Sequence, residues 1–242
     1  MKLIKLDAID STNDFLKDLS NHQSLDNFTV VTATTQTNGR GQMGAKWTSE
    51  PYKNLIMSVL LVDFIDNINN VFQLNELVSL SVYSALEKYN LPNLAIKWPN
   101  DIMSDGKKIG GILIENTIKA DGKISSVIGI GLNVNQLNFE ELSKASSLAK
   151  IGGANFDIDS ILIDIVNSLK TNYLSFQDTI ADYHAMYIQR LFKIGIPMPF
   201  ENNSGTKFMG IIQNVNEKGL LEILLEDNSV ATFNLKEIKM LY

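Results

Sequence analysis

Charged side chains and glycines gather in the segment from Lys97 to Glu115, which offers more chemistry than any other part of the chain. The dipeptide Asp105-Gly106 predicts a hairpin that would hold Lys108 at the mouth of a strand. The bare backbone of Gly110-Gly111 would then let a ligand lie against that strand. Pro99 should end strand pairing and turn Asn100 and Asp101 toward solvent or a ligand. The alternative is an ordinary hairpin with solvated charges.

A second set of candidate residues lies in the polar segment 34–54. Residues 39–44 spell G-x-G-x-x-G, but a dinucleotide fingerprint needs a helix that begins inside the motif. No apolar helical stripe follows here, so we do not favour that interpretation. With Arg40 and Lys46, the loop could instead surround a phosphate with N–H groups and neutralise its charge. The alternative is a flexible surface loop, against which Trp47 argues, because an indole prefers partial burial and could close over a planar ligand.

Composition excludes several classes of protein. The 242 residues are 45% hydrophobic and 20% charged, as in globular proteins. The absence of cysteine excludes disulfides, thiolate metal sites and a cysteine nucleophile, and two histidines argue against a histidine-rich metal site or a Ser-His-Asp triad. A net charge of −6 argues against general nucleic-acid binding. Cations on glycine-rich turns suit a small anionic ligand. With no signal peptide and no spanning segment, we expect a cytoplasmic protein.

Hydrophobic periodicity predicts the elements that must position these residues. Strands are expected at 2–6, 28–33, 55–62, 94–98, 109–114 and 124–131, and helices at 11–20, 70–89, 158–170 and 174–190. Ser11 is a candidate helix cap, and a loop as long as 34–54 is usually functional or disordered. Short strands at 196–200, 207–214, 220–225 and 230–235 predict a small closed β-barrel. We therefore divide the chain into domains at 1–191 and 192–242.

Several of these motifs, taken in order, closely resemble those of the biotin protein ligases. They are Ser11-Thr12-Asn13, Gln36, Gly39-Arg40-Gly41, Trp47, Lys97-Trp98-Pro99-Asn100-Asp101, Lys108-x-Gly-Gly-Ile-Leu-x-Glu and Gly129-Ile-Gly-Leu-Asn-Val-Asn135. Because they begin at residue 11, the resemblance is to the monofunctional form, without the DNA-binding winged helix. It implies an α+β fold: a catalytic domain like that of class II synthetases and biotin ligases, with a mixed β-sheet and flanking helices, and then a small C-terminal SH3-like barrel.

The resemblance implies an ATP-dependent reaction in two steps. The biotin carboxylate joins the α-phosphate of ATP with release of pyrophosphate, and biotinyl-5′-AMP then biotinylates a lysine of a biotin carboxyl carrier domain. Two anions must meet in the first step, so cations have to offset their repulsion. Arg40 and Lys108 are the candidates by position, and Lys108 would hydrogen-bond the carboxylate. Asp101 would steer or deprotonate the incoming amine, or would simply form the turn.

The resemblance also assigns the binding residues. The expected catalytic residues are Lys108, Arg40 and Asp101. The expected biotin-binding residues are Ser11, Thr12, Asn13, Gln36, Arg40, Gly41, Gln42, Lys108, Gly110 and Gly111. The expected ATP-binding residues are Gly39, Arg40, Lys46, Trp47, Asn100, Lys108 and Asn133. Mg²⁺ would arrive with ATP, and we identify no metal site of the protein itself. We expect no DNA or membrane partner, and the sequence leaves a homodimer open. Residues 133–148 would form a second loop over adenosine, unless they are a plain connector.

The sequence departs from the family pattern at two positions. Gln42 and Ala45 stand where arginines are common, and an uncharged Gln42 would retain the adenylate less tightly. Two other functions compete. A lipoate ligase or acyl transferase would have a similar fold, but those proteins carry different glycine motifs and typically a histidine that is missing here. A repressor or scaffold that binds protein through the β-module would leave the cationic glycine-rich loop unexplained.

Overall fold

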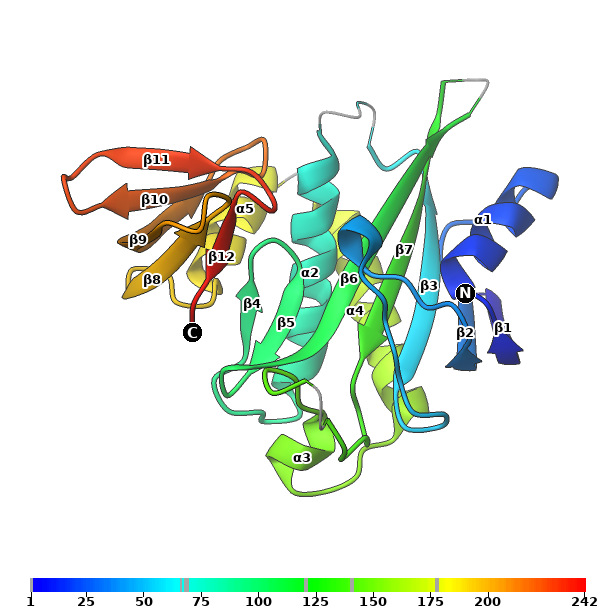
Figure 1. The fold of residues 1–242 in the computed structure, drawn as a ribbon. Coiled ribbons are helices and arrows are strands. Elements are labelled where there is room, and N and C mark those ends of the chain that lie inside the picture. Colours follow the sequence, from blue (N-terminus) through cyan, green and yellow to red (C-terminus); the bar gives the residue numbers. More distant parts are fainter. Residues whose placement is uncertain (1, 66, 68–69, 120–121, 140–141, 177–178) are drawn as a thin grey trace.

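A seven-stranded sheet forms the centre of the computed structural model, which describes residues 2–65, 67, 70–119, 122–139, 142–176 and 179–242 (Figure 1). Its strands are β1 (Lys2–Ile9), β2 (Thr29–Gln36), β3 (Leu55–Val62), β4 (Ala95–Lys97), β5 (Asp101–Ser104), β6 (Lys107–Ile118) and β7 (Ile124–Leu132). They are arranged in the order β1-β2-β3-β7-β6-β5-β4. β1 and β2 are parallel and the other pairs are antiparallel. The sheet is therefore mixed, as expected.

Helices cover both faces of this sheet (Figure 1). They are α1 (Thr12–His22), α2 (Val71–Glu87), α3 (Leu148–Gly152), α4 (Ile158–Phe176) and α5 (Ile180–Gln189). On one face, α2 and α4 pack on each other and bury the main apolar core. On the other face, Leu16 of α1 packs on Val31, Leu60 and Val127. Strand geometry sends successive side chains to opposite faces, so β2, β3 and β7 contribute residues to both cores.

Most elements expected from the sequence are present, some with longer bounds (β1, β2, β6 and α4) and some with shorter bounds (α2, β4 and α5). Ser11 caps α1, because its Oγ accepts a hydrogen bond from the backbone N–H of Asp14 at 3.3 Å. The hairpin predicted at Asp105-Gly106 is confirmed, and both residues have positive φ (48° and 70°), as a two-residue hairpin turn requires. The sequence analysis missed α3, which is only five residues long.

The last part of the chain forms a second, antiparallel sheet (Figure 1). It contains β8 (Pro197–Asn202), β9 (Lys207–Val215), β10 (Leu221–Leu225), β11 (Val230–Phe233) and β12 (Ile238–Met240), in the order β11-β10-β9-β8-β12. Apolar residues of this sheet, among them Phe200, Ile212 and Met240, belong to the same core as α2 and α4. The indole N–H of Trp98 donates to the carbonyl of Gly219 at 3.0 Å. The SH3-like barrel and the boundary at residue 191 stay predictions.

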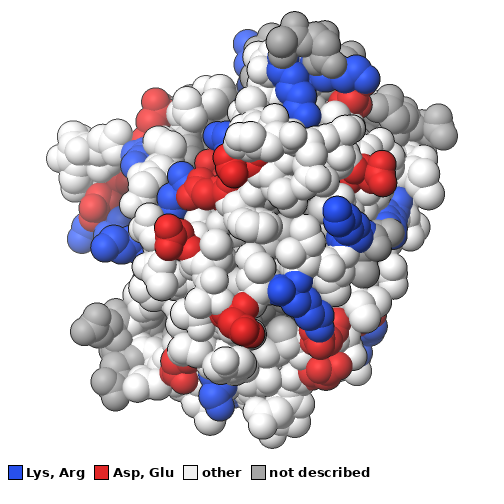
Figure 2. Space-filling model, turned by 90° about the vertical axis from the view of Figure 1, so that its right-hand side faces the viewer, with Lys and Arg blue, Asp and Glu red and all other residues white. Residues whose placement is uncertain are grey.

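Charges of both signs are mixed over the surface on the α1 side of the molecule. Figure 2 shows this side with Lys and Arg scattered among Asp and Glu. Within the described ranges, no helix is long and apolar enough to cross a membrane.

Candidate active site

A cavity of about 490 Å³ opens on the α1 face of the large sheet. Most of the site residues expected from the sequence line it: Ser11, Thr12, Asn13, Gln36, Arg40, Gly41, Gln42, Lys46, Trp47, Asn100, Asp101, Lys108 and Gly111. They come from α1 and its N-cap, β2, the loop 37–54, β5 with the residue before it, and β6. The cavity therefore gathers segments that are far apart in the sequence.

One end of the cavity is polar and is built around Thr12. The backbone N–H of Thr12 and its hydroxyl both donate to the Gln36 side-chain carbonyl, at 2.8 and 3.0 Å. The hydroxyl of Ser58, on β3, lies 2.8 Å from the Thr12 hydroxyl. Ser11 and Thr12 are 3% exposed, so their hydroxyls are held in place by packing. A ligand with a compact polar ring would meet several fixed hydrogen-bonding groups here.

Glycines on two neighbouring strands make the floor of the cavity flat. A Cβ added at Gly129 would lie 2.5 Å from Oδ1 of Asn13, and one added at Gly131 would lie 2.6 Å from the Trp47 ring. Gly111 also lines the cavity, and its Cβ would lie 3.3 Å from Lys108 Nζ. These three positions face the same way because side chains alternate along strands. The sequence analysis did not include Gly129 and Gly131 in the site, although glycine inside a strand is a signal of close approach.

The glycine-rich loop folds back on itself and does not start a helix. Gly41 N–H donates to the Ala45 carbonyl at 2.7 Å, and Trp47 N–H donates to the Gly39 carbonyl at 3.0 Å. A single three-residue turn, Gln42–Gly44, lies between them, with Met43 at φ 54°. The absence of a helix start in these described residues confirms that the motif is no dinucleotide fingerprint.

Arg40 lies in the cavity between two carboxylates. One of its terminal nitrogens, Nη2, pairs with Asp14 of α1 and lies 3.2 Å from the Glu115 carboxylate of β6. The Arg40 side chain is 39% exposed, which leaves its guanidinium accessible to an anionic ligand. Such a ligand would have to compete with Asp14 and Glu115 for the same donors.

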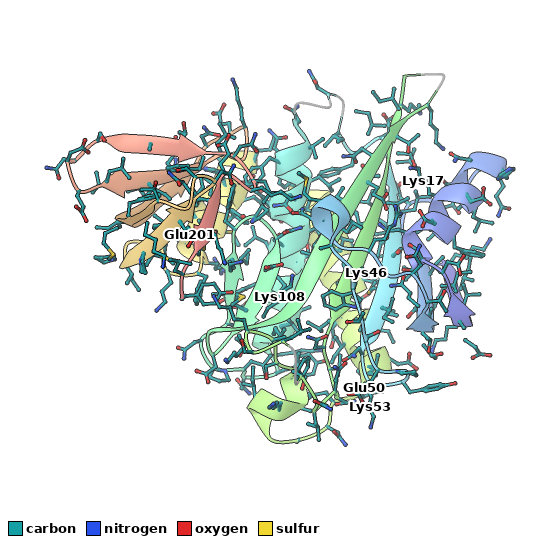
Figure 3. All side chains as sticks on the ribbon, in the orientation of Figure 1. Lys17, Lys46, Glu50, Lys53, Lys108 and Glu201 are labelled. Atoms are coloured by element: carbon teal, nitrogen blue, oxygen red, sulfur yellow. The ribbon has the colours of Figure 1, made fainter. Side chains whose placement is uncertain are left out.

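Lys108 enters the same cavity from β6. Its ammonium lies 2.5 Å from Oδ1 of Asp101, whose second oxygen is 3.4 Å from the ammonium of Lys97. The Lys108 ammonium is also 6.0 Å from the centre of the Trp47 ring. Figure 3 shows Lys108 beside the strands of the sheet and Lys46 on the loop in front of them. Positive side chains from the glycine-rich loop and from β6 thus line one cavity.

The turn before Asp101 differs from the expectation that Pro99 would turn Asn100 outward. Asn100 is 4% exposed, and its amide donates to the carbonyl of Ile112 on β6. The carbonyl of Pro99 accepts hydrogen bonds from Asn75 at 2.9 Å and from the Tyr187 hydroxyl at 2.7 Å. Buried backbone groups need such partners, and the inward-turned Asn100 supplies one to the carbonyl of Ile112. The Asn100 side chain ties the turn to β6, while the charged side chain of Asp101 lines the cavity.

The C-terminal sheet closes one side of the cavity, which sequence reasoning missed. Lys236, Lys239 and Tyr242 line it. The Tyr242 ring lies 4.1 Å from the ammonium of Lys144 and 5.6 Å from that of Lys97. Burial raises the pKa of the Tyr242 phenol, and the negative charge of Asp101 adds to this effect, so the phenol stays neutral. No local pattern marks these residues, because only the packing of the two sheets brings them to the site.

Three of the expected site residues are not among the described residues that line the cavity: Gly39, Gly110 and Asn133. Gly110 faces the opposite side of β6, where an added Cβ would lie 2.9 Å from the Gly131 carbonyl. Asn133 is 6% exposed and donates to the carbonyl of Ser146 at 3.0 Å. It thereby fixes the segment 142–146, whose Lys144 carbonyl accepts the backbone N–H of Lys108 at 2.8 Å. We infer that Asn133 acts on the site through this segment.

The segment 133–148 is tied to the first loop at its base. Gln136 accepts hydrogen bonds from Glu50 N–H at 3.2 Å and from the Asn54 amide at 2.6 Å. Asn135 exchanges two hydrogen bonds with the backbone of Phe156. A loop over adenosine stays a prediction, and residues 140–141 lie outside the described part. Within the described part, no three of His, Asp and Glu come together as a metal site.

Comparison with known proteins identifies a family for this site. The model of the biotin/lipoate A/B protein ligase family matches residues 6–135. The bifunctional ligase/repressor BirA of Bacillus subtilis (strain 168) is 32% identical over 93% of this chain and 70% of its own length. The biotin–[acetyl-CoA-carboxylase] ligase of Mycobacterium tuberculosis is 28% identical over 79% of this chain and 71% of its own length. A solved structure, biotin protein ligase from Aquifex aeolicus in complex with biotin and ATP, has a TM-score of 0.81 and 29% identity, and covers 99% of this chain and 98% of that one.

Proposed function

The chain belongs to the biotin/lipoate A/B protein ligase family, and we propose that it activates biotin with ATP and attaches it to a lysine of a biotin carboxyl carrier domain. It is an ATP-dependent biotin–protein ligase that forms biotinyl-5′-AMP and releases pyrophosphate. The observation that carries this proposal is the convergence of Arg40 and Lys108 on one cavity that also holds the polar Thr12 end.

The first step brings the biotin carboxylate to the α-phosphate of ATP. Both groups are negative, so their approach is favourable only where fixed cations offset the repulsion. We assign this role to Lys108 and Arg40, whose present partners are protein carboxylates. The reactants would replace those carboxylates at the same donors. The cations then need little rearrangement when negative charge develops on the phosphate.

The two ends of the cavity suit the two substrates. Ser11, Thr12 and Gln36 would hydrogen-bond the ureido ring of biotin, and the bare backbone of Gly111, which lines the same cavity, would let its apolar bicycle approach the sheet. On the other side, Lys46 and Trp47 would meet ATP, with the indole ring available for stacking on the adenine. The indole N–H of Trp47 is buried and has no partner within the described structure, so an acceptor on the ligand would satisfy it.

The second step requires an amine that has lost its proton. Asp101 lies between the ammonium groups of Lys97 and Lys108. We propose that it orients the incoming lysine of the carrier and helps to remove its proton. We expect Mg²⁺ to enter with the triphosphate of ATP, because Asp101, the carboxylate next to Lys108, is already paired with two lysines. The cytoplasm as compartment and the absence of a DNA partner stay predictions, and a homodimer stays open.

Pyrophosphate exchange into ATP tests the activity directly. Wild-type protein is incubated with ATP, labelled pyrophosphate and either biotin, lipoate or no acid. Exchange with biotin alone supports the proposal, whereas exchange with lipoate alone would favour the lipoate-ligase alternative. Transfer of labelled biotin to a carrier domain then tests the second step. A protein that supports neither exchange nor transfer with biotin is no biotin ligase.

A further inference from the structure

Glu115 is a motif residue to which neither the sequence nor the proposed reaction gives a role. It lies on β6 two residues after Leu113, and strand alternation places both on the cavity face. One carboxylate oxygen of Glu115 accepts the side-chain amide of Asn13 at 2.8 Å. Both oxygens lie 3.2 Å from Arg40 Nη2. A single carboxylate therefore contacts α1 and the glycine-rich loop.

Asn13 is held at both ends of its side chain. Its Oδ1 accepts the hydroxyl of Ser58 at 2.6 Å, and its Nδ2 donates to Glu115. Asn13 is 4% exposed and Ser58 is fully buried. The amide of Asn13 is thus occupied by protein groups, although the residue lines the cavity beside Thr12. These contacts make a continuous series, Ser58–Asn13–Glu115–Arg40, from the biotin end of the cavity to the loop.

We propose that Glu115 is a positioning residue, which couples the Asn13 side of the biotin pocket to Arg40 on the glycine-rich loop. This inference rests on the proposed function. Arg40 sits on a loop whose backbone hydrogen bonds between residues 39 and 47 are local, apart from the Met43 carbonyl, which accepts the ammonium of Lys236 at 3.2 Å. None of these bonds fixes the Arg40 side chain, so its guanidinium needs an anchor of its own to face the reactants. Glu115 provides one from a strand in the middle of the sheet. Since α1 also supplies Asp14 to Arg40, a shift at the start of α1 would reach Arg40 through both carboxylates.

The substitution Glu115→Gln tests this role with little change in shape. The amide oxygen of the variant can still accept from Asn13, but Arg40 loses a charged partner. We expect the single-turnover rate of biotinyl-adenylate formation, at saturating biotin and ATP, to fall about tenfold, the usual scale for a charge-assisted hydrogen bond. The matched control is Glu222→Gln. Glu222 also accepts an asparagine amide, that of Asn214 at 3.1 Å, but on the C-terminal sheet outside the cavity lining, and its rate should stay unchanged.

A double-mutant cycle separates positioning from a general structural effect. If Glu115 acts through Arg40, Glu115→Gln should cause no further loss of rate in an Arg40→Ala protein. Equal losses in both backgrounds would overturn the inference. A second readout needs no catalysis: in the ligand-free protein, amide hydrogen exchange at Gly41 and Trp47 should become about tenfold faster in Glu115→Gln, and stay unchanged in Glu222→Gln.

The two readouts also distinguish this inference from the proposed function. If wild-type protein shows no biotin-dependent pyrophosphate exchange, the proposed function fails, and the hydrogen-exchange comparison still decides whether Glu115 anchors the loop. If wild type is active but Glu115→Gln leaves both the rate and the exchange at Gly41 and Trp47 unchanged, the inference fails alone. Urea denaturation of each variant checks that the fold is retained.

Discussion

Gly131→Ala should displace Trp47 and with it the glycine-rich loop. The added Cβ would lie 2.6 and 2.7 Å from two carbons of the indole, Cε2 and Cζ2. Ordinary carbon–carbon contact needs about 3.5 Å, so the ring has to move by roughly 1 Å. The indole is a rigid double ring and cannot bend away as a flexible side chain would. Gly131 is paired within β7, between β3 and β6, so the loop is the part that moves.

The cost of this displacement can be worked out from the packing. Inserting a methyl group into a well-packed contact costs typically about 1–3 kcal/mol, which corresponds to about 5- to 150-fold in an equilibrium constant. We expect the cost to fall on loop closure, and so to raise the KM for ATP by a factor in this range. Pyrophosphate exchange at varied ATP and saturating biotin measures the KM.

A double-mutant cycle with Trp47→Ala tests this explanation, because Trp47→Ala removes the ring that the added methyl group would meet. Gly131→Ala should then add little to the defect of Trp47→Ala, because their shared contact is already gone. Fully additive effects on the KM would refute the packing argument. A large drop in the urea midpoint of Gly131→Ala would also refute it, because the strain would then fall on the sheet.

Three further predictions follow from the same contacts. Lys108→Ala should slow adenylate formation by about 10²–10³ with little change in the urea midpoint, because the side chain is 36% exposed; an unchanged single-turnover rate would contradict its role. Asn133→Ala should lower the free energy of unfolding by about 1–3 kcal/mol, because it leaves the Ser146 carbonyl without its amide donor; urea denaturation measures this. Burial raises the pKa of Glu76, and the hydrogen bond and charge of His184 only partly offset this effect. The Glu76 carboxyl therefore stabilises the fold at a pH below its unfolded pKa of about 4.3. This contribution is lost as the pH rises through the higher pKa of the folded state. Glu76→Gln should therefore gain stability relative to wild type as the pH rises, and a difference that is constant with pH would exclude this.

Local patterns in the sequence predicted most strands of the large sheet, but not the short β5, and most cavity residues. The hairpin at Asp105-Gly106 and the helix cap at Ser11 depend on short-range chemistry, and both are present. The inward turn of Asn100 could not be predicted in the same way, because its partner is the carbonyl of Ile112 on another strand. The same holds for Lys236 and Tyr242, which reach the cavity only through the packing of the second sheet.

Gly110 and Gly111 show that the face of a strand decides which of its residues line the cavity. Both glycines were expected to contact biotin, yet only Gly111 lines the cavity. Neighbouring residues on a strand face opposite ways, and Gly110 packs against the carbonyl of Gly131. Alternation along β6 separates Gly110 from Gly111, and alternation along β7 places Gly129 and Gly131 together on the cavity face. The pattern glycine-isoleucine-glycine carries this information, since its two glycines share one face.

The pairing of the cavity cations suggests how one site could serve both steps. In the ligand-free structure, Arg40 is paired with Asp14 and Glu115, and Lys108 with Asp101. When the biotin carboxylate takes over Lys108, Asp101 loses one of its two ammonium partners and keeps Lys97. The Asp101 carboxylate can then accept the ammonium of the carrier lysine in place of that of Lys108. Formation of the adenylate would thus free the group needed for transfer, so Asp101→Asn should slow transfer more than adenylate formation.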